Sequence, residues 1–162
     1  MNWKQRQYAE HLSLDHKDQT VHLSGWVDTI RDHGHLLFLH IRDVSGIVQL
    51  VFDPTRHKKS YEKAQDLHNE YVISITGTVR ERADDAKNPQ IQTGDIEVEV
   101  ETIDILNTAT TPPFVITEKK QLDDDENGSE NVFNVDEDIR LRYRFLDLRR
   151  QSMQARLIQR HQ

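Results

Sequence analysis

Apolar and polar residues alternate along five segments in the first two thirds of the chain. The clearest case is the last segment, where Ile96, Val98 and Val100 alternate with three glutamates. A period of two is typical of a β-strand with one face in a core and the other facing solvent. The pattern therefore predicts five strands, at residues 20–27, 35–42, 46–52, 71–82 and 95–106.

Between the third and fourth segments the period changes to that of a helix. Tyr61, Ala64 and Leu67 recur at helical spacing, and Ser60 is the predicted N-cap. A short, partly helical lead-in covers residues 1–15. Five short antiparallel strands with one helix between the third and fourth make up the OB-fold, a Greek-key barrel whose strand 2–3 face binds oligonucleotides. The predicted fold class is therefore mainly β, a five-stranded OB barrel.

The composition changes after Leu106. Residues 111–138 contain a double proline and an acidic, polar tract, which predicts a flexible linker. Residues 139–162 return to helical spacing and contain seven arginines and one acid. The expected organisation is a barrel domain at 1–110, a linker at 111–138, and a hinge with a helix at 139–162 that leads toward a partner domain.

The net charge of −7 argues weakly against a nucleic-acid partner. The acidic linker and the basic tail nearly cancel, and residues 1–117 carry 12 basic and 18 acidic side chains. Nonspecific attraction of phosphates is therefore not the main property of the barrel, and any recognition of nucleic acid there must depend on local contacts.

The absence of cysteine excludes disulfides, thiolate zinc sites and a cysteine nucleophile. The longest apolar run is four residues, from Leu36 to Leu39, far short of a membrane span. The first residues lack the apolar stretch of a secretory signal. The expected location is the cytoplasm, with no membrane partner.

Strand parity selects an aromatic ring and an amide as candidate binding groups. If the aliphatic residues of 37–41 fill the barrel, Phe38 faces outward, and the same argument places Gln49 outward on the next strand. An exposed ring stacks on any base, and a side-chain amide offers a donor and an acceptor to a base edge. The alternative is that Phe38 packs under a loop and that Gln49 is an ordinary solvent-facing residue.

Charged residues border this face. Arg31, Arg80 and Arg82 lie at predicted strand ends, placed either to meet phosphates or to be solvated. Glu97 is an acceptor-only group suited to the N1–H and amino group of guanine, or simply one of three solvent-facing glutamates. His33 and His35 lack a third metal ligand nearby, and no phosphate-binding glycine loop or G-x-S-x-G motif is present. The residues therefore predict neither a metal site nor a catalytic site.

Several motifs together resemble the bacterial-type aspartyl-tRNA synthetases, a family of class II aminoacyl-tRNA synthetases. The resemblance extends over residues 7–160, and the combination of its last two motifs is specific, whereas lysyl and asparaginyl relatives share the shorter ones. The motifs are "GWV" at 25–27, "GIVQ" at 46–49, "GTVR" at 77–80, "TGDIEV" at 93–98 and "YRFLDLRR" at 143–150.

The resemblance implies that the barrel binds the anticodon loop of aspartate tRNA, with the anticodon G-U-C or its queuosine form. It implies that Phe38 stacks on the central uridine, that Gln49 reads its edge, and that Glu97 reads the first base. The other RNA-binding positions that it implies are Arg31, Arg80, Arg82 and Asn88.

The resemblance also implies a parent enzyme, an aspartate–tRNA ligase that uses ATP and magnesium and is a homodimer. The three catalytic motifs of the family are absent, so the chain alone is expected to be an inactive monomer without a cofactor. Its expected protein partner is the catalytic domain of the parent enzyme. Gln151 stands where the family usually has proline, and His33 stands where many members have leucine. Two alternatives stay open: a stand-alone OB module for single strands or a protein partner, or the equivalent domain of an asparaginyl or lysyl relative.

Overall fold

The computed structural model describes residues 6–117 and 135–161. The chain forms two compact units, Met1–Thr111 and Pro112–Gln162. Most of the predicted linker, residues 118–134, lies outside the described residues. No helix in the described ranges is long and apolar enough to cross a membrane.

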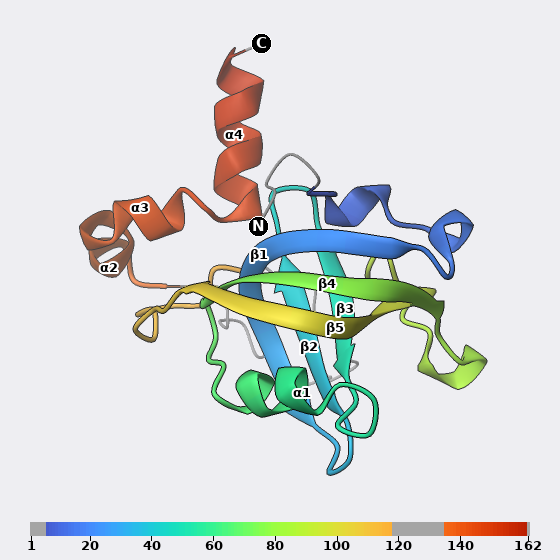
Figure 1. Ribbon diagram of the computed structural model, residues 1–162. Coiled ribbons are helices and arrows are strands. Elements are labelled where there is room, and N and C mark those ends of the chain that lie inside the picture. Colours follow the sequence, from blue (N-terminus) through green and yellow to red (C-terminus); the bar gives the residue numbers. More distant parts are fainter. Residues whose placement is uncertain (1–5, 118–134, 162) are drawn as a thin grey trace, which may run out of the picture. The chain divides into compact units, whose positions relative to one another are not determined.

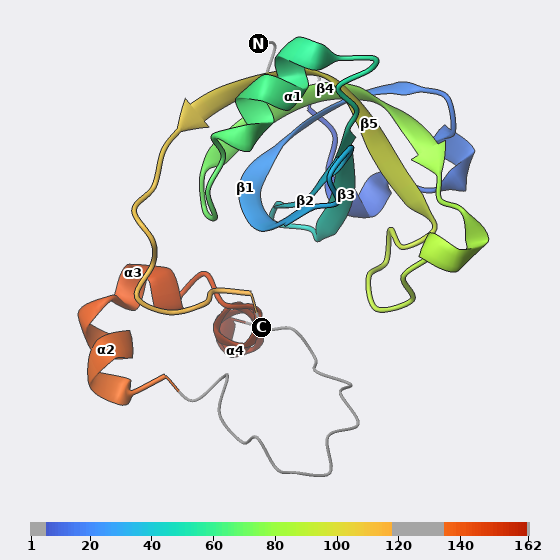
Figure 2. The same cartoon turned by 90° about the horizontal axis from the view of Figure 1, so that it is seen from below.

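Five strands close into a barrel in the first unit (Figures 1 and 2). Around the barrel the order is β1-β2-β3-β5-β4. The β3–β5 pair is parallel, and the other four pairs are antiparallel. The predicted five-stranded OB barrel is therefore confirmed. The strands are β1 (Thr20–Asp32), β2 (Leu37–Arg42), β3 (Ile47–Phe52), β4 (Val72–Glu81) and β5 (Ile96–Asn107).

The core consists of the apolar residues that alternate along these strands. Burying each such aliphatic or aromatic side chain stabilises the fold by about 1.5–3 kcal/mol before the entropy of ordering is counted. The parity assigned from the sequence is thereby confirmed. The largest fully buried side chains are Val21, Val27, Leu39, Val48, Leu50, Phe52, Ile73, Ile75, Val79, Ile96, Val98 and Val100.

The first strand is longer than the alternation predicted, because it continues through a β-bulge. Its register against β2 shifts between Val27 and Thr29, which leaves Asp28 as the extra residue. One extra residue moves all the following side chains to the opposite face. Arg31 is thereby paired with Phe38 and shares its outward face. The apolar pattern stops at residue 27 because of this change of phase.

The helices of the first unit are short. The lead-in forms two 3₁₀ turns, η2 (Ala9–His11) and η3 (Leu14–His16). A third turn, η4 (Asp84–Ala86), follows β4. The helix α1 (Lys58–Gln65) lies at one end of the barrel beside β5 (Figure 2). The prediction of Ser60 as N-cap is wrong, since the N-cap is His57, three residues earlier, and the helix begins at Lys58. The helix starts early because residues 53–57 form a turn just before it, in which the amide of His57 donates to the carbonyl of Asp53. The hydroxyl of Ser60 instead donates to the carbonyl of Glu101, at 2.6 Å.

The predicted C-terminal helix is divided into three in the second unit: α2 (Glu137–Arg142), α3 (Arg144–Asp147) and α4 (Gln151–His161). The carboxylate of Asp147 is fully buried, and Arg140 and Arg144 donate to it at 3.0 and 2.7 Å. Arg140 is two turns away in a continuous helix, so the break at Tyr143 brings it within reach. A buried carboxylate needs such partners, which explains why local helical spacing is overridden here.

Candidate nucleic-acid interface

The outer face of the barrel over β2, β3 and β5 carries Phe38, Gln49 and Glu97. The residues before and after each of them are buried in the core. Because successive side chains of a strand point to opposite faces, these three point away from the core. The structure therefore brings together the ring, the amide and the carboxylate that the sequence selected.

The ring of Phe38 is half-buried. In the strand ladders its partners are Arg31 on β1 and Val51 on β3. The ring of His33, from the β1–β2 turn, packs on it edge to face, with 5.3 Å between the centroids and 90° between the planes. These neighbours hold the orientation of the Phe38 ring while part of it stays exposed.

Gln49 faces outward but is more covered than the sequence predicted. Its side-chain Nε2 donates a hydrogen bond to Oε2 of Glu97, at 2.9 Å, and the residue is only 9% exposed. The two residues come from the parallel strands β3 and β5, whose register is set by the pair Leu50–Val98. The alternative of an ordinary solvent-facing glutamine is therefore wrong, because an adjacent strand from much later in the chain supplies a partner.

Arg82 is also buried, at 4% exposed, so the alternative of a solvated charge at a strand end is wrong for this residue. Its Nε donates to the carbonyl of Ile96 at 2.8 Å, and its amide donates to the carbonyl of Asp95. Its Nη2 is buried without a hydrogen-bond partner among the described residues. Burial lowers the pKa of the Arg82 guanidinium, and the nearby charge of Glu97 opposes that change. This cation therefore anchors the loop after β4 beside the carboxylate of Glu97.

Glu97 lies between opposing electrostatic influences. Burial raises its pKa, whereas the hydrogen bond from Gln49 and the charge of Arg82 lower it, and Glu99 raises it further. The net effect is a carboxyl group whose pKa is above the ordinary value. It holds the proton more tightly than an exposed glutamate does.

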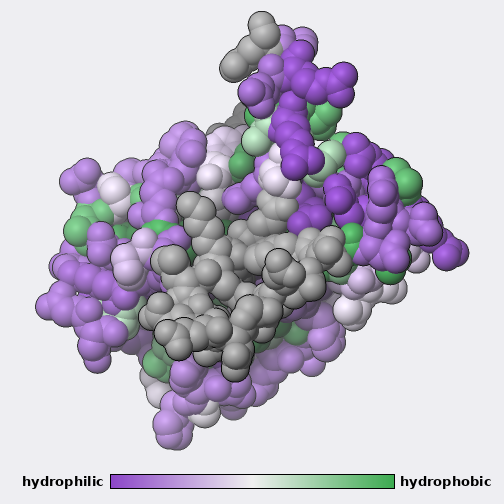
Figure 3. All heavy atoms as spheres, turned by 180° about the vertical axis from the view of Figure 1, so that it is seen from behind, coloured by the Kyte–Doolittle hydropathy of each residue, from purple (hydrophilic) through white to green (hydrophobic). Residues whose placement is uncertain are grey.

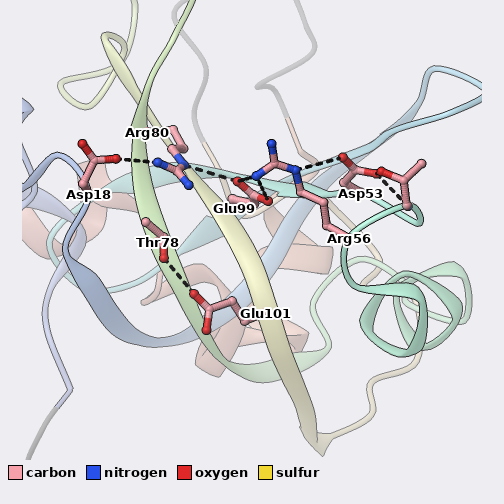
Figure 4. A network of polar contacts seen from close by, with 8 residues as sticks. Asp18, Asp53, Arg56, Thr78, Arg80, Glu99 and Glu101 are labelled. Carbon is pink, nitrogen blue, oxygen red and sulfur yellow. Dashed lines mark hydrogen bonds and ion pairs between the residues drawn. The ribbon is translucent and has the colours of Figure 1, made fainter.

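Arg80 is the ladder partner of Glu97 on β4 and belongs to a row of charged side chains (Figure 4). It bonds Asp18, and its Nε is 3.3 Å from Oε2 of Glu99. Arg56 donates to the other side of Glu99, at 3.0 Å, and also faces Asp53. Arg56 is not among the residues that the sequence predicted for the site, since it lies in a turn and its partner is 43 residues away.

Asn88 shapes the loop between β4 and β5. Its Oδ1 accepts from the amide of Gln90 at 3.0 Å, and its own amide donates to the carbonyl of Gly94. Among the described residues its side chain makes no hydrogen bond to Gln49 or Glu97, so Asn88 stands apart from that pair.

Exposed side chains on the face drawn in Figure 3 are mostly hydrophilic, with apolar ones in small groups. Within residues 6–117 and 135–161 no three histidine, aspartate or glutamate side chains gather at a possible metal site.

Comparison with known proteins places these features in context. The family described as "OB-fold nucleic acid binding domain" matches residues 21–106. An aspartate–tRNA(Asp/Asn) ligase of Dictyoglomus turgidum is 47% identical over 154 residues, which are 95% of this chain and 24% of that protein. A ligase of the same name from Syntrophus aciditrophicus is 43% identical over 99% of this chain and 22% of its own length. The chain thus spans about a quarter of these relatives.

Solved structures show the same fold. Asparaginyl-tRNA synthetase from Pyrococcus horikoshii superimposes with a TM-score of 0.68 and 26% identity, over 90% of this chain and 29% of that one. Aspartyl tRNA synthetase from Entamoeba histolytica gives a TM-score of 0.74 at 23% identity, over 91% of this chain and 33% of that one.

Proposed function

The chain belongs to the family of OB-fold nucleic acid binding domains, and on that premise we propose that its barrel binds the anticodon loop of aspartate tRNA. The resemblance to aspartyl-tRNA synthetases predicted from the motifs is confirmed by the 47% identity to a ligase of that kind. The observation that carries the proposal is the Gln49–Glu97 hydrogen bond on the outer face that also presents Phe38. The site combines a surface for stacking with groups for hydrogen bonding to a base edge.

In this proposal each side chain has a distinct role. The ring of Phe38 stacks on the central uridine, an interaction worth about 1–3 kcal/mol. Gln49 hydrogen-bonds to the Watson–Crick edge of that base, and Glu97 accepts from the first base, guanine. Arg31, exposed beside Phe38, contacts the RNA backbone. Single-stranded bases splayed over a barrel face are the usual targets of sequence-specific RNA recognition.

The remaining proposed RNA-binding residues, Arg80, Arg82 and Asn88, contribute mainly by shaping the site and its charge. Arg82 places a buried positive charge beside Glu97, and Asn88 shapes the loop bordering the site. Arg80 is already paired with Asp18 and Glu99, so it reaches a phosphate only by exchanging those partners. With few free cations on an acidic barrel, we expect the affinity to depend only weakly on salt.

The test is binding of the 162-residue protein to an anticodon stem–loop with the sequence G-U-C and to one in which the central base is cytosine. Fluorescence anisotropy at fixed salt gives both affinities. Tighter binding of the uridine form supports base recognition. Equal affinity for both stem–loops contradicts it.

For the larger protein we propose an aspartate–tRNA ligase that uses ATP and magnesium, acts in the cytoplasm and is a homodimer. We assign its catalytic activity to the part of the larger protein that corresponds to the three quarters of the relatives that this chain does not match. The 162-residue protein itself is proposed to be a monomer that forms no aspartyl-adenylate. Pyrophosphate exchange that depends on aspartate, measured with this protein, would contradict that part of the proposal.

A second candidate substrate is asparagine tRNA, whose anticodon differs from that of aspartate tRNA in the third base. The observation in its favour is that the relatives named above are aspartate–tRNA(Asp/Asn) ligases. His33, which packs against Phe38, also stands where many members of the family have leucine. Affinities for G-U-C and G-U-U stem–loops within threefold of each other would support dual binding, and a tenfold or larger preference for G-U-C would reject it.

A further inference from the structure

We propose that Glu97 fixes the orientation of the Gln49 side-chain amide, so that the amide presents its carbonyl oxygen, not its NH₂ group, to a bound base. The inference deepens the proposed anticodon recognition and rests on it. It makes Glu97 a positioning residue for Gln49 as well as a binding group.

The chemistry of the pair decides which end of the amide faces Glu97. An ionised carboxylate only accepts hydrogen bonds, so the group that approaches it must be a donor. In Gln49 that donor is the NH₂ group, and Nε2 lies 2.9 Å from Oε2 of Glu97. The opposite end, Oε1, therefore points away from the carboxylate.

Packing restricts the alternative orientation. Gln49 is 9% exposed, and the neighbouring residues Val48 and Leu50 are fully buried in the core. The parallel ladder between β3 and β5 holds the two backbones in register at Leu50 and Val98. Turning the amide over would place a carbonyl against a carboxylate in a partly desolvated setting, where an unmade hydrogen bond costs about 1–3 kcal/mol.

The orientation leaves two acceptor atoms available to a ligand. Neither Oε1 of Gln49 nor Oε1 of Glu97 accepts a hydrogen bond within the described residues. The fully buried side-chain atoms without a partner in those residues belong to Arg82 and Arg150, so both oxygens retain contact with solvent. The surface beside Phe38 therefore presents one neutral and one anionic acceptor.

Two acceptors favour bases with a ring N–H on the Watson–Crick edge. Uracil has its N3–H there and guanine its N1–H, whereas cytosine and adenine have an unprotonated ring nitrogen at the same position. When that nitrogen faces a fixed oxygen, neither atom can donate, and both are left without a hydrogen bond. This is a strong basis for rejecting cytosine and adenine. Because one carboxylate both contacts a base and orients Gln49, recognition at the two positions is coupled.

Arg82 supports this arrangement because its positive charge favours the ionised form of Glu97. The other groups that act on the carboxylate are Gln49, from β3, and Glu99, on the same strand. Burial alone favours the protonated form of Glu97, and the buried guanidinium of Arg82 opposes it. A protonated Glu97 is a donor as well as an acceptor and no longer dictates the orientation of the amide.

The test compares wild type with Glu97→Gln and with the control Glu101→Gln, all as the full 162-residue protein. A glutamine at 97 both donates and accepts, so both orientations of the Gln49 amide become available. Glu101 faces the same side of β5 but accepts from Thr78 at 2.7 Å and not from Gln49. Two measurements are made: the ¹⁵N–¹H spectrum of the Gln49 side-chain amide without RNA, and the affinities for G-U-C and G-C-C stem–loops.

In wild type and Glu101→Gln we expect one Gln49 amide proton to be shifted downfield and slow to exchange, and the uridine form to be preferred. In Glu97→Gln we expect that signal to lose its shift and the preference to fall about tenfold, the equivalent of about 1.4 kcal/mol. Comparing loops that differ only in the central base cancels the loss of any contact between Glu97 and the first base.

Unchanged amide signals in Glu97→Gln would overturn the proposal, and so would a preference for uridine that survives the loss of those signals. If wild type binds neither stem–loop, it is the proposed function that fails. The amide spectra then still decide whether Glu97 orients Gln49.

Discussion

Arg42 donates from one guanidinium nitrogen to both carboxylate oxygens of Glu70, at 2.7 and 2.9 Å. Its other terminal nitrogen is 3.1 Å from Oδ1 of Asp28, the bulged residue of β1. All three side chains are at most 11% exposed. The bulge that turns Arg31 toward Phe38 is thus secured by an ion cluster that involves the chain segment before β4.

We expect Arg42→Ala to destabilise the barrel by about 3–5 kcal/mol, because it removes the guanidinium that neutralises two desolvated carboxylates. Urea denaturation followed by circular dichroism measures the change. The matched control is Arg156→Ala, an exposed position on α4, for which we expect a change within about 0.5 kcal/mol. Similar stabilities for the two variants would show that the cluster contributes little.

Adjacent residues of β2 should separate binding from folding. Phe38→Ala should weaken binding of the G-U-C stem–loop by about 1–3 kcal/mol with little change in stability. Leu39→Ala, at a fully buried position, should instead cost about 2–5 kcal/mol of stability. Anisotropy and urea titrations of both variants give the comparison, and exchanged results would mean that the two faces of the strand are assigned the wrong way round.

The loop bordering the site depends on a close backbone approach at Gly94. A Cβ atom there would lie 1.7 Å from the carbonyl oxygen of Asn88, whereas at Gly46 it would meet nothing within 4 Å. We expect Gly94→Ala to cost about 1–3 kcal/mol, as overpacking does, since a backbone atom has to move. Gly46→Ala should change the free energy of unfolding by less than about 1 kcal/mol. A thermal melt of each variant measures the difference, and equal melting temperatures would contradict it.

The helical unit should lose stability in acid because of Asp147. Burial raises the pKa of this carboxyl group, but Arg140, Arg144 and Arg150 outweigh burial, and the net pKa is lowered. A lowered folded pKa contributes stability that is present above the unfolded pKa, about 3.9, and is lost as the pH falls through the folded pKa. Helix content at 222 nm should therefore decrease in wild type below about pH 4.

Asp147→Asn should already have lower helix content at neutral pH and should depend less on pH. Asp138→Asn, an exposed change on α2, serves as the control and should behave as wild type does. An acid transition that persists in Asp147→Asn would assign it to other groups.

Local periodicity was sufficient for the strands and for much of the site. The alternation around Phe38 and Glu97 assigned both side chains to the outer face, because the side-chain direction of a strand repeats every two residues whatever it pairs with. A motif resemblance then indicated the family. Both kinds of information lie within short windows of the chain.

What surrounds each side chain was decided only by the tertiary structure. Gln49 meets Glu97 because closure of the barrel makes β3 and β5 parallel neighbours, 48 residues apart in the chain. The antiparallel pairing of β4 with β5 holds the buried Arg82 against Asp95 and Ile96. A buried carboxylate at Asp147 interrupts a helix that local spacing predicts as continuous. Hydrogen-bond partners and desolvation depend on which distant strands and helices meet, and no pattern confined to one segment contains that information.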